Sequence, residues 1–203
     1  MRMLPKLDSA GAELSVERGA TVFRIGDSFF AREATADDLD TITEIWLDGA
    51  ALAFGEDGPD LSDLDGIRDQ LLKLIRQQSA DFKFWLCIDC NGTIAGWCTV
   101  QPFHTTPFQK IREAYGLISA YMGRAWRGRG LGVLFLEFVI GYCRARTNLT
   151  YIFGFQDRSN TASVRAFERV GFTEFGKLPN IAGFAPISMI ICTAEAPKSK
   201  DEA

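Results

Sequence analysis

The sequence has no excess of positive charge, because 22 lysines and arginines stand against 26 aspartates and glutamates, giving a net charge of −4. Proteins that bind nucleic acid or an anionic membrane through their overall charge show the opposite balance, so we expect neither partner. The sequence also lacks a run of about 20 apolar residues and the apolar core of a signal peptide near its start. These absences predict a cytoplasmic protein.

Patterns that bind metals are equally sparse. The chain has 1 histidine and 5 cysteines, and only Cys87 and Cys90 show CxxC spacing, with no second pair. That pair lies in a strand-like run, where residues three apart point to opposite faces, so we expect no metal site. Four of the cysteines lie in apolar segments, where a free cysteine behaves as a small hydrophobic residue.

What the sequence does contain is a globular composition, with 47% hydrophobic and 24% charged residues in a chain of 203. This length can bury one sizeable core, so we expect an N-terminal extension over residues 1–27 that could include a strand, one domain over residues 28–194, and a polar tail over residues 195–203. Strand-like and helix-like patterns alternate, and Asn91-Gly92 is typical of a hairpin turn. The predicted strands are residues 21–25, 28–33, 82–90, 93–103, 114–122, 149–155, 173–178 and 186–193, and the predicted helices begin near residues 36, 63, 131 and 160. This order predicts a mixed α/β domain.

A segment rich in glycine and arginine, residues 121–132, lies between a predicted strand and a predicted helix. Glycines let backbone amides approach a ligand closely, and the free N–H groups at a helix start favour a phosphate. Residues 114–136 contain three arginines and no acid. The P-loop pattern is absent, and Gly128, Gly130 and Gly132 do not have the spacing of a dinucleotide-binding loop. An Arg-x-x-Gly-x-Gly pattern remains, and a solvated turn with no ligand is the open alternative.

A second pattern, over residues 160–172, makes the interpretation more specific. Together the two segments resemble the GNAT superfamily of acyl-CoA-dependent N-acetyltransferases, over about residues 30–178. The family's pyrophosphate loop, [R/Q]xxGx[G/A], matches Arg127, Gly130 and Gly132. Its second signature matches Asn160, Ser163, Gly171 and Phe172. Residues 157–178 are also loosely similar to the phosphinothricin acetyltransferase branch of the family.

The resemblance implies a central mixed, mostly antiparallel sheet of about six to seven strands flanked by about four helices. It implies acetyl-CoA as the acyl donor, no metal, and direct transfer to an amine. The strand at residues 114–122 would separate from that at residues 149–155 and leave a V-shaped slot for the pantetheine arm. The cofactor-binding residues implied are Ala120, Met122, Arg127, Gly128, Arg129, Gly130, Leu131, Gly132, Val133, Asn160, Ser163 and Phe167.

The chain departs from the family at the usual acid and base. Phe167 stands where the family has a tyrosine that protonates the leaving thiolate, and residues 116–117 lack the glutamate often found there. Tyr121 and Glu113 share one strand face by period-two alternation, so we expect Tyr121 to donate to the thiolate and Glu113 to act as a base through water. Packing of Tyr121, a surface role for Glu113 and His104 as the base remain open alternatives.

The acceptor is less well defined than the donor. Residues 31–70 hold 12 acids and 2 basic residues, which in this family would lie beside the acceptor site. These acids would attract a cationic amine such as a polyamine, an aminoglycoside or a basic peptide, and a solvated helix surface with no such role is the open alternative. We expect transfer of an acetyl group to a primary amine of a small molecule. The alternatives are a protein or peptide N-acetyltransferase and a catalytically impaired CoA-binding sensor, and a homodimer is left open.

Overall fold

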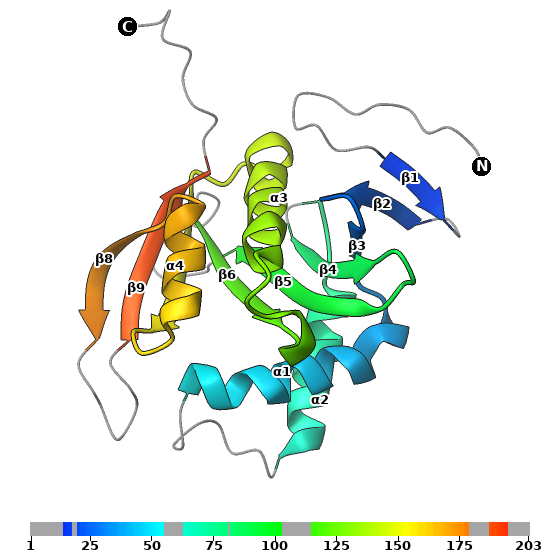
Figure 1. Cartoon of the computed structure of the whole chain (residues 1–203), viewed down its shortest axis with the longest axis horizontal. Helices are drawn as coiled ribbons and strands as arrows, with labels where there is room; N and C mark the ends of the chain where they lie inside the picture. Colours follow the sequence, from blue (N-terminus) through cyan, green and yellow to red (C-terminus); the bar gives the residue numbers. More distant parts are fainter. Residues whose placement is uncertain are drawn as a thin grey trace, which may run out of the picture.

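The computed structural model describes residues 14–17, 20–54, 63–80, 82–102, 115–178 and 187–194. In this part of the chain nine strands form one sheet in the order β1-β2-β3-β4-β5-β6-β7-β9-β8, accompanied by four α-helices (Figure 1). The strands are β1 Leu14–Glu17, β2 Ala20–Arg24, β3 Phe29–Glu33, β4 Lys83–Asp89, β5 Ile94–Pro102, β6 Tyr115–Met122, β7 Tyr151–Asp157, β8 Thr173–Leu178 and β9 Ile187–Thr193. The helices are α1 Leu39–Phe54, α2 Leu64–Arg76, α3 Leu131–Arg146 and α4 Thr161–Arg169, with short 3₁₀ turns at η1 Ala36–Asp38 and η3 Arg124–Trp126. None of the described helices is long and apolar enough to cross a membrane.

The expected mixed, mostly antiparallel sheet is confirmed, since β6 and β7 are the one parallel pair among the described strands. The sheet has nine strands, where the resemblance implied about six to seven and the residue patterns predicted eight. Part of the difference comes from the predicted N-terminal extension, where β1 pairs with β2 and β2 pairs with β3. The hairpin predicted at Asn91-Gly92 joins β4 to β5, and Gly92 has the positive φ of 83° that such a turn uses.

Helices cover both faces of the sheet, as the alternation along β4 shows. Phe84 and Leu86 point to a core shared with α1 and α2, whereas Trp85 and Cys87 point to a core shared with α3. Successive residues of a strand face opposite sides, so one strand contributes to both cores. The sheet therefore has an α1/α2 face and an α3/α4 face. The candidate site lies between these two faces, where β6 separates from β7.

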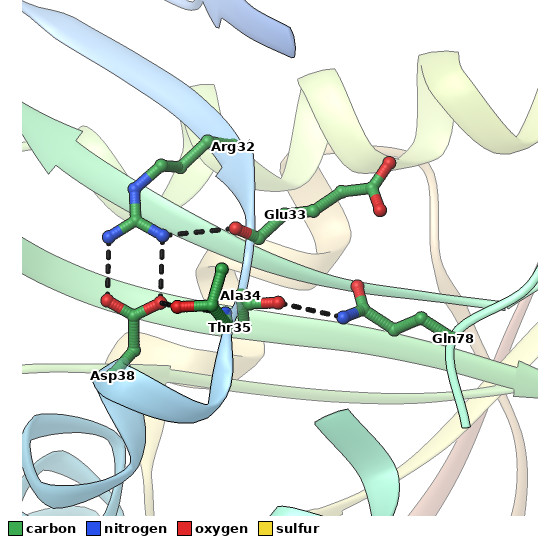
Figure 2. Close-up of polar contacts among 6 residues, drawn as sticks. All are labelled: Arg32, Glu33, Ala34, Thr35, Asp38 and Gln78. Atoms are coloured by element: carbon green, nitrogen blue, oxygen red, sulfur yellow. Dashed lines mark hydrogen bonds and ion pairs between the residues drawn. The ribbon is translucent and has the colours of Figure 1, made fainter. Parts of the chain in front are cut away.

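A polar network fixes the start of α1 against the sheet (Figure 2). The Arg32 guanidinium donates two hydrogen bonds of 2.8 and 2.7 Å to the Asp38 carboxylate, which also accepts bonds from the backbone N–H and the hydroxyl of Thr35. Gln78, just after α2, donates to the carbonyl of Ala34 at 2.8 Å. The Arg32, Thr35 and Gln78 contacts together hold β3, η1 and the end of α2 in one arrangement, because each partner comes from a different element.

The five cysteines are free thiols, and four of them are buried. Burial raises the pKa of Cys87 and of Cys143 to about 12 and that of Cys192 to about 11. Cys90 is exposed, so the two residues of the CxxC pair lie in different environments. Within the described residues no cluster of three His, Cys, Asp or Glu side chains could hold a metal ion.

Candidate active site

The glycine- and arginine-rich loop connects β6 to α3 and owes its shape to two glycines. Gly128 and Gly130 have φ values of 74° and 78°, a left-handed conformation that other residues adopt only with strain. Gly130 is the N-cap of α3 and provides no side-chain cap. The local sequence therefore starts helix α3 without a side chain that caps the backbone N–H groups of its first turn.

The backbone N–H groups at this turn are available to a ligand. Residues 128–132 donate no hydrogen bond from their backbone nitrogens within the described part of the chain, and the first such bonds are made by Val133 and Leu134 to the Gly130 carbonyl. No acid lies in the first turn of α3. Unsatisfied N–H groups and the positive end of the helix dipole favour an anion, and phosphate groups suit such a site well.

The arginines of the loop play different roles from those the sequence suggested. Arg127 donates to an Asp48 carboxylate oxygen at 2.6 Å and to the Met122 carbonyl at 2.8 Å. Arg124 donates its backbone N–H and its Nε to the same carboxylate, each at 3.1 Å. Two of the three arginines are thus engaged by α1, and Arg129, whose guanidinium lies 5.8 Å from the Trp126 ring centroid, is exposed. The backbone, more than the side chain of Arg127, is left to meet a diphosphate.

The predicted separation of the two central strands is present. β6 and β7 pair at Tyr115–Leu117 with Tyr151–Phe153 and no further, although both strands continue. We call residues 118–122 the unpaired β6 edge. The Gly123 N–H donates to the Ala95 carbonyl of β5 at 2.9 Å, so by alternation Ala120 and Met122 turn their backbone groups to the other side, toward β7.

Only part of that backbone is free. Because the Met122 carbonyl accepts a bond from Arg127, Ala120 is the residue of the unpaired β6 edge with both its N–H and its carbonyl placed to pair with an extended ligand. Such pairing is the way an extended chain adds to an exposed sheet edge.

Helix α4 carries the second signature. Asn160 is its N-cap, and the side-chain oxygen accepts a bond from the Ser163 N–H at 3.1 Å. This bond explains the asparagine structurally and leaves its amide nitrogen available. The Phe167 ring packs edge-on against Phe172, with 5.0 Å between ring centroids. Phe167 also lines a cavity of about 240 Å³ between α4 and strands β7, β8 and β9.

A second, smaller pocket lies on the α1/α2 face directly over β5 and β6. Its volume is about 150 Å³. Thr99, Gln101 and Ser119 form a polar row on the strands, and the indole rings of Trp46 and Trp97 contribute walls. We call this cavity the α1/α2 pocket. It adjoins the unpaired β6 edge, because Ser119 belongs to both.

Tyr121 lies at the border between the α1/α2 pocket and the unpaired β6 edge. Its ring packs against Trp97 at 4.5 Å between centroids, and α1 approaches it so closely that a Cβ on Gly49 would lie 2.5 Å from Tyr121 Cδ1. Burial raises the pKa of Tyr121, and hydrogen bonding with Trp46 offsets part of the rise. An indole N–H can only donate, so a contact of this kind with Trp46 leaves the Tyr121 hydroxyl its own proton for another acceptor.

Many of the acids expected to attract a cationic acceptor are already paired within the chain. Glu33 bonds Lys83 at 2.7 Å, Asp40 bonds Arg68 at 2.5 Å, and Asp63 caps α2. Asp38 and Asp48 belong to the contacts described above. Five of the 12 acids of residues 31–70 thus have partners within the described part of the chain.

Two sequence-based candidates, Glu113 and His104, fall outside the described residues. Three residues of the site gave no signal in the sequence: Asp48, Trp46 and Thr99. Their roles depend on partners in distant segments, so periodicity and motif spacing could not reveal them. Gly49 did carry a weak signal, since a glycine inside a helix costs stability and often marks a close contact.

Known proteins resemble this chain in sequence and in fold. The sequence matches the acetyltransferase (GNAT) domain family over residues 29–173. It is similar to YwnH of Bacillus subtilis (strain 168), provisionally named a phosphinothricin acetyltransferase, with 33% identity over 98 residues, covering 46% of this chain and 55% of that protein. The chain thus matches about half the length of this curated relative.

Solved structures with different acceptors share the fold. A GNAT superfamily phosphinothricin acetyltransferase from Sinorhizobium meliloti in complex with AcCoA has 18% identity and a TM-score of 0.67, covering 83% of this chain and 90% of its own. A ribosomal-protein-S5-alanine acetyltransferase from Vibrio fischeri has 16% identity and a TM-score of 0.66, covering 85% and 96%. At these identities the likeness concerns the fold alone. Because the family match spans residues 29–173, well over half of the sequence, the chain belongs to the GNAT family of acetyltransferases.

Proposed function

We propose that this protein transfers an acetyl group from acetyl-CoA directly to a primary amine of a small molecule. The observation that carries the proposal is the row of free backbone N–H groups at residues 128–132, held at a helix start by two left-handed glycines. A diphosphate satisfies such a row better than a neutral ligand does. The acetyl-CoA complex of the Sinorhizobium meliloti relative supports the same donor.

In this proposal the donor lies along the unpaired β6 edge. Its diphosphate contacts the N–H groups of residues 128–132, its pantetheine arm pairs with Ala120, and Ser163 with the amide of Asn160 contacts the same arm from α4. Leu131 and Val133 complete the loop, and Phe167 provides an apolar contact. The roles of the loop and of Ala120 rest on the free N–H groups and on the strand separation, and those of Asn160, Ser163 and Phe167 rest on the family resemblance.

The chemistry is then mainly one of positioning. The neutral amine attacks the thioester carbonyl carbon, a C–N bond forms, the C–S bond breaks, and the sulfur leaves as a thiolate. Tyr121 donates its proton to that thiolate, which suits a hydroxyl whose raised pKa keeps it protonated near neutral pH. The ammonium group first loses one proton to water, with Glu113 as the base that the sequence offers. The nitrogen loses a second proton as the amide forms, and this proton returns through water to the Tyr121 oxygen.

The size of the α1/α2 pocket favours a small acceptor. A volume of about 150 Å³ admits one compact group and no folded partner, although a single terminal residue of a peptide would also fit. A second candidate function, a CoA-binding sensor, is favoured by one observation, because Phe167 replaces the hydroxyl-bearing residue of the family.

The test measures binding first and chemistry second. Acetyl-CoA at about 100 times its dissociation constant should add about 2.7 kcal/mol to the free energy of unfolding, seen as a higher Tm. Gly130→Asp should remove this shift, because it strains a left-handed position and places a carboxylate at the anion site. Gly92→Asp is the matched control, since Gly92 has the similar φ of 83° in a distant turn and should keep the shift.

Thiol release with a panel of amines then separates the two candidates. Turnover with a small amine supports the enzyme, and Tyr121→Phe should lower kcat without weakening acetyl-CoA binding. Tight binding with no thiol release for any amine or peptide would favour the sensor. A wild-type protein that acetyl-CoA fails to stabilise would refute both.

A further inference from the structure

Thr99 carries a buried hydroxyl that the folded chain does not use. The residue lies in the middle of β5, pairs with Ser119 of β6, and is 0% exposed. Its Oγ1 has no hydrogen-bond partner within the described part of the chain. Leaving a buried hydroxyl unpaired costs about 1–3 kcal/mol, and native proteins contain few such groups. Because Thr99 lines the α1/α2 pocket, a group that enters this pocket can provide the missing partner.

The surroundings of Thr99 indicate what that partner is. Thr99 lines the α1/α2 pocket between Trp97 and Gln101, and no side chain lining this pocket is charged among the described residues. The polar groups it offers are hydroxyls and carboxamides, and the rest of the wall is aromatic and aliphatic. A second ammonium group, as in a polyamine, would find no carboxylate among the described residues that line the pocket, and desolvating it without a partner is costly.

The volume limits the size of the group that enters. An engineered protein cavity of about 150 Å³ holds one benzene molecule, and the α1/α2 pocket has a volume of about 150 Å³. Roughly one ring, or an aliphatic group of about the same size, can therefore enter it.

We infer that the α1/α2 pocket binds the body of the acceptor amine, and that Thr99 selects acceptors whose body carries an uncharged hydrogen-bonding group such as a hydroxyl or carboxamide. This inference rests on the proposed function and goes beyond it by naming the class of acceptor. It is an alternative to the cationic acceptor that the acid count over residues 31–70 suggested. A site that must satisfy a buried polar group discriminates strongly against an analogue that lacks the matching group.

The experiment compares amines that differ in one hydroxyl. The pairs are tyramine with phenethylamine and ethanolamine with propylamine, and the measurement is kcat/KM from thiol release at saturating acetyl-CoA. The wild-type protein should favour the hydroxylated member of at least one pair by about tenfold or more. Thr99→Val, which keeps the shape and removes the hydroxyl, should bring that ratio close to one, mainly through KM of the amine.

Two further variants make the result specific. Thr99→Ser keeps a hydroxyl and should retain the preference for the hydroxylated amine. If Thr99→Val does not fold, loss of the preference in Thr99→Ser would still contradict the inference. Thr43→Val is the matched control, because Thr43 is also buried but its hydroxyl already donates to the Leu39 carbonyl at 2.7 Å. It should lower Tm without changing the ratio, whereas Thr99→Val should raise Tm by removing the unpaired group.

Three results would overturn the inference while leaving the proposed function intact. They are an unchanged ratio in Thr99→Val, a wild-type preference for both amines that lack the hydroxyl, and a wild-type preference for spermidine over all four amines. Failure of the proposed function looks different, since acetyl-CoA would then not stabilise the wild-type protein, or no amine would release thiol. In that case the inference falls with it.

Discussion

Replacing Asp48 by alanine should weaken acetyl-CoA binding, although the change removes a negative charge from beside the proposed diphosphate site. Asp48 accepts three hydrogen bonds, from the Arg124 backbone N–H, the Arg124 Nε and the Arg127 guanidinium. Through Arg127 it also connects α1 to the Met122 carbonyl at the end of the unpaired β6 edge. Asp48 therefore holds the loop in the shape that presents its free N–H groups.

The loss of loop positioning and the gain from removing a negative charge can be compared in magnitude. The Arg124 side chain is 85% exposed, so water screens its pair with Asp48 and little is lost there. The Arg127 side chain is 28% exposed, and a hydrogen bond between charged groups in such a place contributes about 1–2 kcal/mol after a discount from the usual 1.5–3. Removing one negative charge about 10 Å from a doubly charged diphosphate in water-like surroundings gains about 0.8 kcal/mol. The loss of positioning should exceed this gain, so the dissociation constant should rise about threefold.

Isothermal titration with acetyl-CoA measures this directly. Asp48→Asn serves as a second variant, because it keeps the shape of the side chain and one acceptor oxygen and should lose less affinity than Asp48→Ala. Asp40→Ala is the matched control, since Asp40 lies on the same helix and its pair with Arg68 at 2.5 Å is 78% exposed on the Asp40 side. It removes the same charge without touching the loop and should change affinity by less than about twofold. Tighter binding of acetyl-CoA by Asp48→Ala would refute the reasoning.

Three other predictions concern stability and reactivity. Burial opposes ionisation of Asp38, but hydrogen bonds from its partners outweigh burial and hold its pKa below the ordinary value. The stability that the Asp38 carboxylate contributes is therefore present above about pH 4 and is lost as the pH falls below that value. Urea unfolding at several pH values should show this loss of stability, and Asp38→Asn should remove the pH dependence. Gly49→Ala should lower the free energy of unfolding by about 1–3 kcal/mol, because the new Cβ meets the Tyr121 ring. Gly141→Ala is the control inside α3, where a new Cβ meets nothing within 4 Å, and it should raise the free energy of unfolding by up to about 1 kcal/mol. An equal effect at both glycines would contradict the proposed clash with Tyr121. Cys90 alone should react rapidly with a thiol reagent in the native state, since it is the exposed one of the five cysteines, and a second fast thiol would show that the core opens readily.

The elements that sequence predicted well are those specified by neighbouring residues. The hairpin at Asn91-Gly92 requires a positive φ at one position, and the start of α3 follows from Gly130 before an apolar helix. Both signals lie within a few residues of the structure they produce. The separation of β6 from β7 was expected from the family resemblance, and the pairing that stops at Leu117 and Phe153 confirms it.

The free charge on the acceptor side cannot be read from the sequence, for a physical reason. The acids of residues 31–70 were counted as one charged surface, but Asp38 and Asp48 form ion pairs with arginines. The arginine that pairs with Asp48 is Arg127, which lies 79 residues away along the chain. Charge counted along a sequence says nothing of which carboxylates are paired, because pairing depends on which segments the fold brings together.

The sequence by itself determined the glycine loop, the N-cap at Asn160 and the order of helices and strands, since each depends on backbone preferences of adjacent residues. Only the tertiary structure decided that Asp48 holds the loop, that Trp46 reaches Tyr121, and that the Thr99 hydroxyl is buried without a partner beside a small pocket. Those contacts join residues far apart in the chain, and they exist because both faces of one twisted sheet are packed by helices from different segments.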